Sequence, residues 1–297
     1  MPATPTPLIA SDGRALGATT FTAEATRRGA VAVLPGLAIP ARFYRHLAGY
    51  LAADGFDVLT FDPRGIGTSV VGRVRDEEAD LSDWVHLDYR AALGWLSEQP
   101  GPHLVVGHSL GGQTVGLLDE VGHLDGLYAV AAQLAYWRRY PSPTRYGMLG
   151  AFRLMPALAR TFGYLPGWSG FGEDVPKGVI VEWCRWLNSP GYLLDHVEGA
   201  AARFARCRTP SVMLGFTDDT YAPPAGVEAI AACLPSSRTT LRIVDPAEWG
   251  QPAIGHFGGF RPVGRGDDAA PNPLWTDVRE HLRGWAQDAG ARAPQTG

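Results

Sequence analysis

The residues with the clearest chemical potential surround Ser109. The stretch from His103 to Gly112 reads HLVVGHSLGG, which contains the pattern Gly-x-Ser-x-Gly directly after an apolar run. An apolar strand that enters a helix through this pattern is typical of a nucleophile elbow, in which a sharp turn exposes the serine hydroxyl. The glycines leave room for the strained backbone of such a turn. The pattern predicts that Ser109 is a nucleophile, and the alternative is a glycine-rich turn with an incidental serine.

A serine hydroxyl is a weak nucleophile and needs a base and an orienting acid. Among eight histidines, His256 lies in a glycine-rich loop, IGHFGG, between the last expected strand and the last expected helix. This place completes the chain order Ser, Asp, His. The loop after the preceding strand offers two acids, Asp218 and Asp219. The spacing from Gly215 favours Asp218, and counting back from Pro223 favours Asp219. We predict Asp218 as the acid, with Asp219 as the alternative.

Negative charge on a reacting carbonyl oxygen needs backbone N–H donors nearby. One donor of such a pair follows the nucleophile, which is Leu110 in this chain. The other comes from the loop after the first parallel strand, here PGLA from Pro35. We assign it to Leu37, although Pro35 and Gly36 could equally form an ordinary turn.

The elements that must position these residues follow from alternating apolar runs and amphipathic stretches. Apolar runs at 31–34, 58–61, 104–106, 127–131, 212–214 and 241–244 are predicted strands, and 41–54, 83–98, 111–120, 225–234 and 274–287 are predicted helices. Most of the runs lack polar alternation, as expected for strands covered by helices on both faces. The pattern predicts an α/β fold with a mostly parallel central sheet flanked by helices. A Ser-Asp-Gly turn within 9–21 predicts a hairpin before the sheet.

The alternation is interrupted between about residues 133 and 206, where four of nine tryptophans and six prolines fall. We interpret 133–206 as an inserted, mainly helical cap on a core formed by 1–132 and 207–297. An insertion after a sheet strand lies where ligands bind in such folds, although single aromatic residues there could also simply pack the cap. The predicted substrate-binding side chains are aromatic: Trp137, Trp183, Trp186 and Phe257.

The composition argues against several other classes of function. The chain has 297 residues with 45% apolar and 19% charged residues, typical of a globular protein, and a formal net charge of -4. A weakly acidic chain without a basic run is a poor candidate for binding nucleic acid or anionic membrane. The three cysteines form no C-x-x-C pair, and no H-E-x-x-H metal motif or dinucleotide-binding glycine pattern occurs. We therefore expect no metal, no cofactor and a small-molecule substrate.

No signal peptide is visible in residues 1–13, and no apolar stretch approaches the length of a membrane span. From these two observations we expect a cytoplasmic protein.

With these residues in place, the chain resembles the α/β-hydrolase superfamily over nearly its whole length. The stretch from Asp62 to Ser69, DPRGIGTS, is similar to a D-x-R-G-x-G-x-S loop of many members. We expect Arg64 in this loop to tie loops together. The sequence looks closest to bacterial predicted α/β hydrolases related to serine-aminopeptidase-like and lysophospholipase-like proteins, through the stretches 43–45, 163–167, 172–176 and 255–257.

The resemblance implies a triad of Ser109, His256 and Asp218, and it does not imply a substrate, because the fold hosts many chemistries. We expect a serine hydrolase that cleaves an ester or thioester of a small, apolar or aromatic compound through an acyl-enzyme. The alternatives are an acyltransferase or lyase-type enzyme with the same triad, and a small-molecule receptor without turnover.

Overall fold

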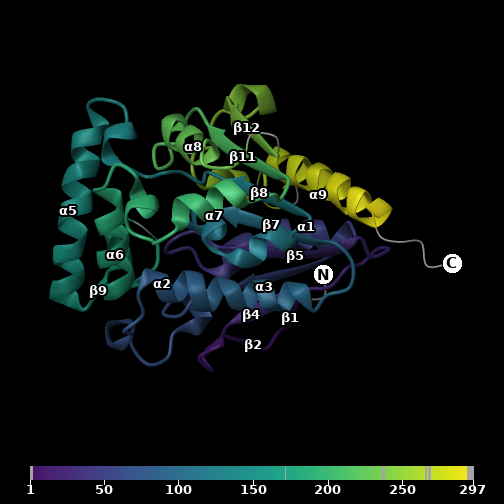
Figure 1. Cartoon of the computed structure of the whole chain (residues 1–297), viewed down its shortest axis with the longest axis horizontal. Coiled ribbons are helices and arrows are strands. Elements are labelled where there is room, and N and C mark those ends of the chain that lie inside the picture. Colours follow the sequence, from purple (N-terminus) through teal and green to yellow (C-terminus); the bar gives the residue numbers. More distant parts are fainter. Residues whose placement is uncertain (1–2, 171, 236–237, 265, 267–268, 293–297) are drawn as a thin grey trace.

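A central sheet of eight strands organises the chain in the computed structural model, which describes residues 3–170, 172–235, 238–264, 266 and 269–292 (Figure 1). The order across the sheet is β1-β4-β6-β5-β7-β8-β11-β12. The six strands from β6 to β12 in this order are parallel to one another, whereas β4 is antiparallel to both β6 and the edge strand β1. The strands are β1 (Ala3–Pro5), β4 (Ala18–Phe21), β5 (Gly29–Leu34), β6 (Phe56–Phe61), β7 (His103–His108), β8 (Gly126–Val130), β11 (Ser211–Phe216) and β12 (Thr239–Val244). The predicted fold class and the six predicted strands are confirmed.

The segment before the sheet contains the predicted hairpin. Strand β2 (Leu8–Ile9) pairs antiparallel with β3 (Ala15–Leu16) around the Ser-Asp-Gly turn. The edge strand β1 was not predicted, because it is short and exposed and therefore carries no apolar signal.

Helices cover both faces of the sheet, which explains the lack of polar alternation in its strands. Every residue of β5, β6 and β11 is buried. On one face, Val31 and Val33 belong to a core with α1 (Arg45–Ala53) and α9 (Pro273–Arg292). On the other face, Ala30 and Ala32 belong to a core with α3 (Arg90–Ser97). The core also contains α2 (Leu81–Asp83), a π-helical turn (Trp84–Tyr89), α4 (Leu110–Thr114), a 3-10 turn (Val115–Leu117), α8 (Pro224–Ala231) and several further short 3-10 turns.

The chain leaves the sheet after β8 and returns at β11. The connection holds α5 (Thr144–Phe162), α6 (Lys177–Leu187), α7 (Ala200–Arg206) and a small pair of strands, β9 (Tyr164–Leu165) and β10 (Val175–Pro176). Figure 1 shows α5 and α6 side by side at one end of the molecule, and α7 closer to the sheet. We call residues 133–206 the inserted segment, and its status as a separate cap stays a prediction. No described helix combines the length and apolar character needed to cross a membrane.

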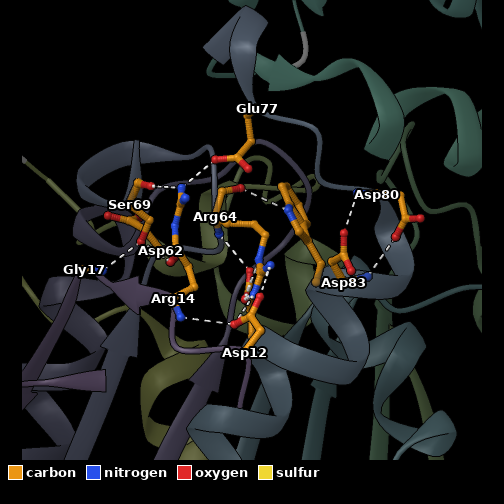
Figure 2. Close-up of polar contacts among 11 residues, drawn as sticks. Asp12, Arg14, Gly17, Asp62, Arg64, Ser69, Glu77, Asp80 and Asp83 are labelled. Carbon is orange, nitrogen blue, oxygen red and sulfur yellow. Dashed lines mark hydrogen bonds and ion pairs between the residues drawn. The ribbon is translucent and has the colours of Figure 1, made fainter. Parts of the chain in front are cut away.

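A buried ion pair fastens the loop that follows β6 (Figure 2). The Arg64 guanidinium donates to Asp88 at 2.7 and 2.9 Å. It also donates at 2.8 Å to Asp12, which Figure 2 labels beside it. Asp88 Oδ2 also accepts the Arg64 backbone N–H, and the Trp84 indole donates to the Arg64 carbonyl. Burial raises the pKa of the Asp88 carboxyl, against the opposing effect of Arg64. Arg64 thus ties the loop to the hairpin and to the π-helical turn, as expected.

Candidate active site

Ser109 sits on a strained turn between β7 and α4. Its φ of 48° and ψ of -118° lie in a region that residues with a side chain rarely adopt. The glycines around it allow close packing: a Cβ on Gly107 would lie 2.7 Å from Gly112 Cα, and a Cβ on Gly111 would lie 2.2 Å from the Leu34 carbonyl oxygen. Such a backbone conformation costs about 1–3 kcal/mol, which the surrounding contacts must offset.

His256 pairs with a buried carboxylate across the carboxyl end of the sheet. Its Nδ1 lies 2.8 Å from Asp219 Oδ2, and the two side chains are 6% and 0% exposed. The other oxygen, Asp219 Oδ1, accepts the backbone N–H groups of Tyr221 and Ala222, each at 2.8 Å. A carboxylate held in this way accepts the Nδ1–H of the imidazole and leaves Nε2 able to take a proton.

The prediction that Asp218 accepts the imidazole N–H is wrong, because that carboxylate points into the loop before the histidine. It accepts the Ile254 N–H at 2.8 Å and the Gly255 N–H at 3.0 Å. The alternative acid, Asp219, is the partner of His256. The two adjacent acids therefore hold the same loop by different means, one through its backbone and the other through the imidazole.

The residue before the nucleophile, His108, lies at the centre of a buried chain of hydrogen bonds. Its Nε2 lies 3.0 Å from the His256 carbonyl oxygen, which can only accept, so Nε2 carries the hydrogen. Its Nδ1 then accepts from the Tyr44 hydroxyl at 2.9 Å, whose oxygen in turn accepts the Gly36 N–H at 2.9 Å. Burial, with the nearby His256, holds the pKa of His108 well below its usual value. A neutral His108 therefore connects the loops of Gly36, Ser109 and His256.

The two expected oxyanion donors border the nucleophile. A Cβ on Gly36 would lie 3.2 Å from Ser109 Cβ, so the loop that carries Leu37 passes directly over the serine. Leu110 is the first residue of α4, where a backbone N–H has no acceptor within the helix. Among the described residues, no acceptor is found for the Leu37 N–H. Both assignments stay predictions.

A narrow cavity of about 40 Å³ contains Ser109 and His256. At about 10–15 Å³ per water it holds a few waters, so a substrate can enter only if lining side chains move. Its remaining lining residues are Leu37, Ile39, Gln113, Gln133, Tyr140, Met148, Phe152, Trp183, Tyr221 and Phe257.

The aromatic residues expected to bind substrate divide into two groups. Trp183 and Phe257 line the cavity, whereas Trp137 and Trp186 lie outside its lining. Trp186 is 2% exposed and packs edge-on against Tyr192, with ring centroids 5.6 Å apart. Trp137 packs beside Tyr136 at 5.8 Å and under Arg138.

Sequence reasoning missed the polar lining residues. Gln113 lies one helical turn after Ser109, and Tyr221 lies two residues after Asp219, so distance along the chain from the predicted triad could have found both. Gln133 follows the end of β8 and had no comparable signal. No cluster of His, Cys, Asp and Glu side chains that could hold a metal occurs in the part of the chain that the structure describes.

Comparisons with known proteins agree with this architecture. Residues 25–167 match the model of the family described as serine aminopeptidase, S33. A monoacylglycerol lipase from Paleococcus ferrophilus is similar over 91% of this chain and 99% of its own, with 19% identity and a TM-score of 0.60. A soluble variant of monoglyceride lipase from Saccharomyces cerevisiae, solved with a substrate analog, is similar over 96% of each chain, with 15% identity and a TM-score of 0.64.

A third solved structure, Est1E from Butyrivibrio proteoclasticus with bound ferulic acid, is similar over 95% of this chain and 98% of its own, with 14% identity and a TM-score of 0.58. No curated protein sequence matches the chain. At these identities the structural likeness shows the fold. With the family match over residues 25–167, it shows that this chain has the α/β-hydrolase fold.

Proposed function

We propose that the protein is a serine hydrolase that cleaves an ester or thioester of a small, apolar or aromatic compound. The observation that carries the proposal is the buried pair of His256 and Asp219, 2.8 Å apart, in one cavity with the strained Ser109. A glycine-rich turn without a role in chemistry would have no need of a paired imidazole at the same cavity. Structures of similar fold that are lipases or esterases support the proposal.

In the proposed reaction, His256 Nε2 takes the proton of the Ser109 hydroxyl as Oγ attacks the acyl carbonyl carbon. The N–H groups of Leu37 and Leu110 stabilise the resulting oxyanion, each by about 3 kcal/mol. Collapse of this intermediate breaks the bond to the alcohol or thiol, which leaves with the proton from His256. Asp219 keeps the imidazole in the required tautomer and stabilises its charged form.

The second half of the reaction frees the enzyme. A water that gives its proton to His256 attacks the acyl-enzyme, and the acid leaves as Ser109 takes the proton back. The apolar and aromatic lining, Ile39, Phe152 and Trp183 included, favours a small apolar or aromatic group on the substrate. We also propose that the inserted segment, 133–206, acts as a cap that covers this cavity.

Intact-protein mass spectrometry with a fluorophosphonate tests the proposal. The wild type should gain one adduct, and Ser109→Ala should gain none. The control variant Ser97→Ala changes an exposed serine of α3 and should label like the wild type. Absence of an adduct on correctly folded wild-type protein would contradict an activated Ser109 and would favour a receptor without turnover. Product analysis with a competing alcohol then separates hydrolysis from acyl transfer.

A further inference from the structure

A hydrogen-bond relay from the inserted segment fixes the orientation of the Gln113 side chain. The indole Nε1–H of Trp183 donates to the Tyr192 hydroxyl oxygen at 2.8 Å. An indole nitrogen can only donate, and the Tyr192 hydroxyl hydrogen has no other acceptor among the described residues, so this hydrogen is donated to Gln113, 2.8 Å away. The Gln113 atom at that contact must therefore be the acceptor Oε1. This orientation of the amide gives the Tyr192 hydroxyl hydrogen an acceptor, whereas the reversed amide would leave that hydrogen unpaired.

The opposite end of this amide faces the cavity with its hydrogen-bond donors unused. Gln113 is 2% exposed and lines the cavity that contains Ser109 and His256. Within the described residues, its Nε2 has no hydrogen-bond partner, and it is not among the side-chain atoms that are fully enclosed without one. A buried amide nitrogen with two unpaired hydrogens is costly unless water or a ligand accepts from it.

The other glutamine of the cavity is arranged differently. Gln133 Nε2 donates to the Tyr221 carbonyl oxygen at 2.6 Å and to the Tyr140 hydroxyl at 3.3 Å, so both of its hydrogens are already used. Its Oε1 faces Gly226, where an added Cβ would lie 2.6 Å away. Of the two amides, only that of Gln113 presents a donor for a substrate.

The lining limits which acceptor can bind there. Among the described residues that line the cavity, none is an arginine or a lysine. A carboxylate or phosphate would thus be buried without a counter-ion, at a cost of several kcal/mol. An uncharged oxygen, such as that of an ether, ketone or hydroxyl group, satisfies the amide without this penalty.

We infer that Gln113 is a specificity-determining residue, and that the substrate carries an uncharged oxygen acceptor that binds Gln113 Nε2. The inference rests on the proposed function, because it places this oxygen in the substrate of Ser109. Trp183 and Tyr192 are positioning residues that keep the donor directed into the cavity. A site built to donate a hydrogen bond disfavours analogues without the acceptor, because its polar group then stays unpaired.

Matched ester pairs test the inference by replacing one oxygen with a methylene. On the acyl side the pair is p-nitrophenyl methoxyacetate and p-nitrophenyl butyrate, and on the alcohol side it is methoxyethyl acetate and butyl acetate. The measured quantity is the ratio of kcat/KM within each pair. In Gln113→Met, which keeps the side-chain length without a donor, this ratio should fall roughly three- to tenfold relative to wild type in at least one pair.

Two further variants separate the donor from general damage to the site. Tyr192→Phe releases the Gln113 amide and should lower the ratio in the same pair. Trp186→Phe is the control, because Trp186 packs on the Tyr192 ring without joining the relay, and it should leave the ratio unchanged. All variants are first labelled with a fluorophosphonate, so that failure of Ser109 to react is recognised separately as failure of the proposed function.

Two outcomes would overturn the inference in variants that still label. Unchanged ratios in both pairs would show that no substrate oxygen binds Gln113. Equal losses of kcat/KM for both members of each pair would show that the Gln113 amide contacts a group present in every ester, such as the reacting carbonyl oxygen.

Discussion

Replacing the buried His108 with asparagine should make the free energy of unfolding less dependent on pH. The Oδ1 of an asparagine can take the place of the imidazole Nδ1 and still accept from the Tyr44 hydroxyl. The variant loses the donor to the His256 carbonyl oxygen, which stays buried without that partner. Leaving a buried polar group unpaired costs about 1–3 kcal/mol, and His108→Asn should be less stable by this amount at pH 7.5.

The sign of the pH dependence follows from the lowered pKa of His108. In the unfolded chain a histidine has a pKa of about 6.5, so below that pH the unfolded state binds a proton that the folded state does not. The buried, neutral His108 therefore contributes fully to the free energy of unfolding above pH 6.5. This contribution is lost as the pH falls from 6.5 towards the pKa of His108 in the folded protein. Between pH 6.5 and 4.5 the loss reaches at most about 2.7 kcal/mol, at 1.36 kcal/mol per unit. His108→Asn has no imidazole at this position and does not lose stability in this way. The difference in free energy of unfolding between wild type and His108→Asn should therefore shrink or vanish at pH 4.5.

Urea unfolding at several pH values, followed by tryptophan fluorescence, measures this difference. The control is His123→Asn, which changes an exposed histidine and should leave the curve of stability against pH parallel to that of the wild type. A parallel curve for His108→Asn would refute the assignment of His108 as a buried, neutral link.

The remaining predictions concern the carboxylates. Asp219→Asn should lower kcat for p-nitrophenyl esters by roughly 10³–10⁴-fold, because the amide favours the wrong imidazole tautomer. Asp218→Asn keeps an acceptor for the loop backbone and should lower kcat about tenfold or less, and an equal effect of the two variants would contradict the proposed roles. Asp88→Ala leaves the buried Arg64 guanidinium without its main partner and should lower the free energy of unfolding in urea by about 3–5 kcal/mol, and a loss under 1 kcal/mol would show that the pair is not a structural tie.

The central sheet was predictable because its strands are buried on both faces. Runs such as 31–34 and 104–106 must be apolar throughout when helices cover both sides, and that leaves a clear signal. The helix predicted at 111–120 was too long, because α4 ends at Thr114 and continues only as a short 3-10 turn. There Phe204 of α7 packs on Gly116, a contact between residues far apart in the chain that periodicity cannot reveal.

The positions of the candidate site residues in the chain were predictable, but the directions in which some of their side chains point were not. The motif at Ser109 and the loop position of His256 each follow from local sequence. The choice between Asp218 and Asp219 depends on which carboxylate the turn directs at the imidazole, and adjacent residues on a tight turn point in different directions. The orientation of Gln113 depends on a relay through the inserted segment, which no spacing rule describes.

The points at which the inserted segment joins the sheet are adjacent. Strands β8 and β11 are hydrogen-bonded neighbours, with Tyr128 opposite Val212, so the connection begins and ends one strand spacing apart, about 4.8 Å. The chain between the end of β8 at Val130 and the start of β11 at Ser211 can therefore be treated as a single loop whose ends are fixed close together by the sheet. The entropy of closing a flexible loop grows only with the logarithm of its length, by about 0.6 kcal/mol per doubling. The free-energy cost of replacing this connection with one of another length is therefore small, and such a replacement would remove Trp183 and Tyr192, and with them the relay to Gln113, in one step.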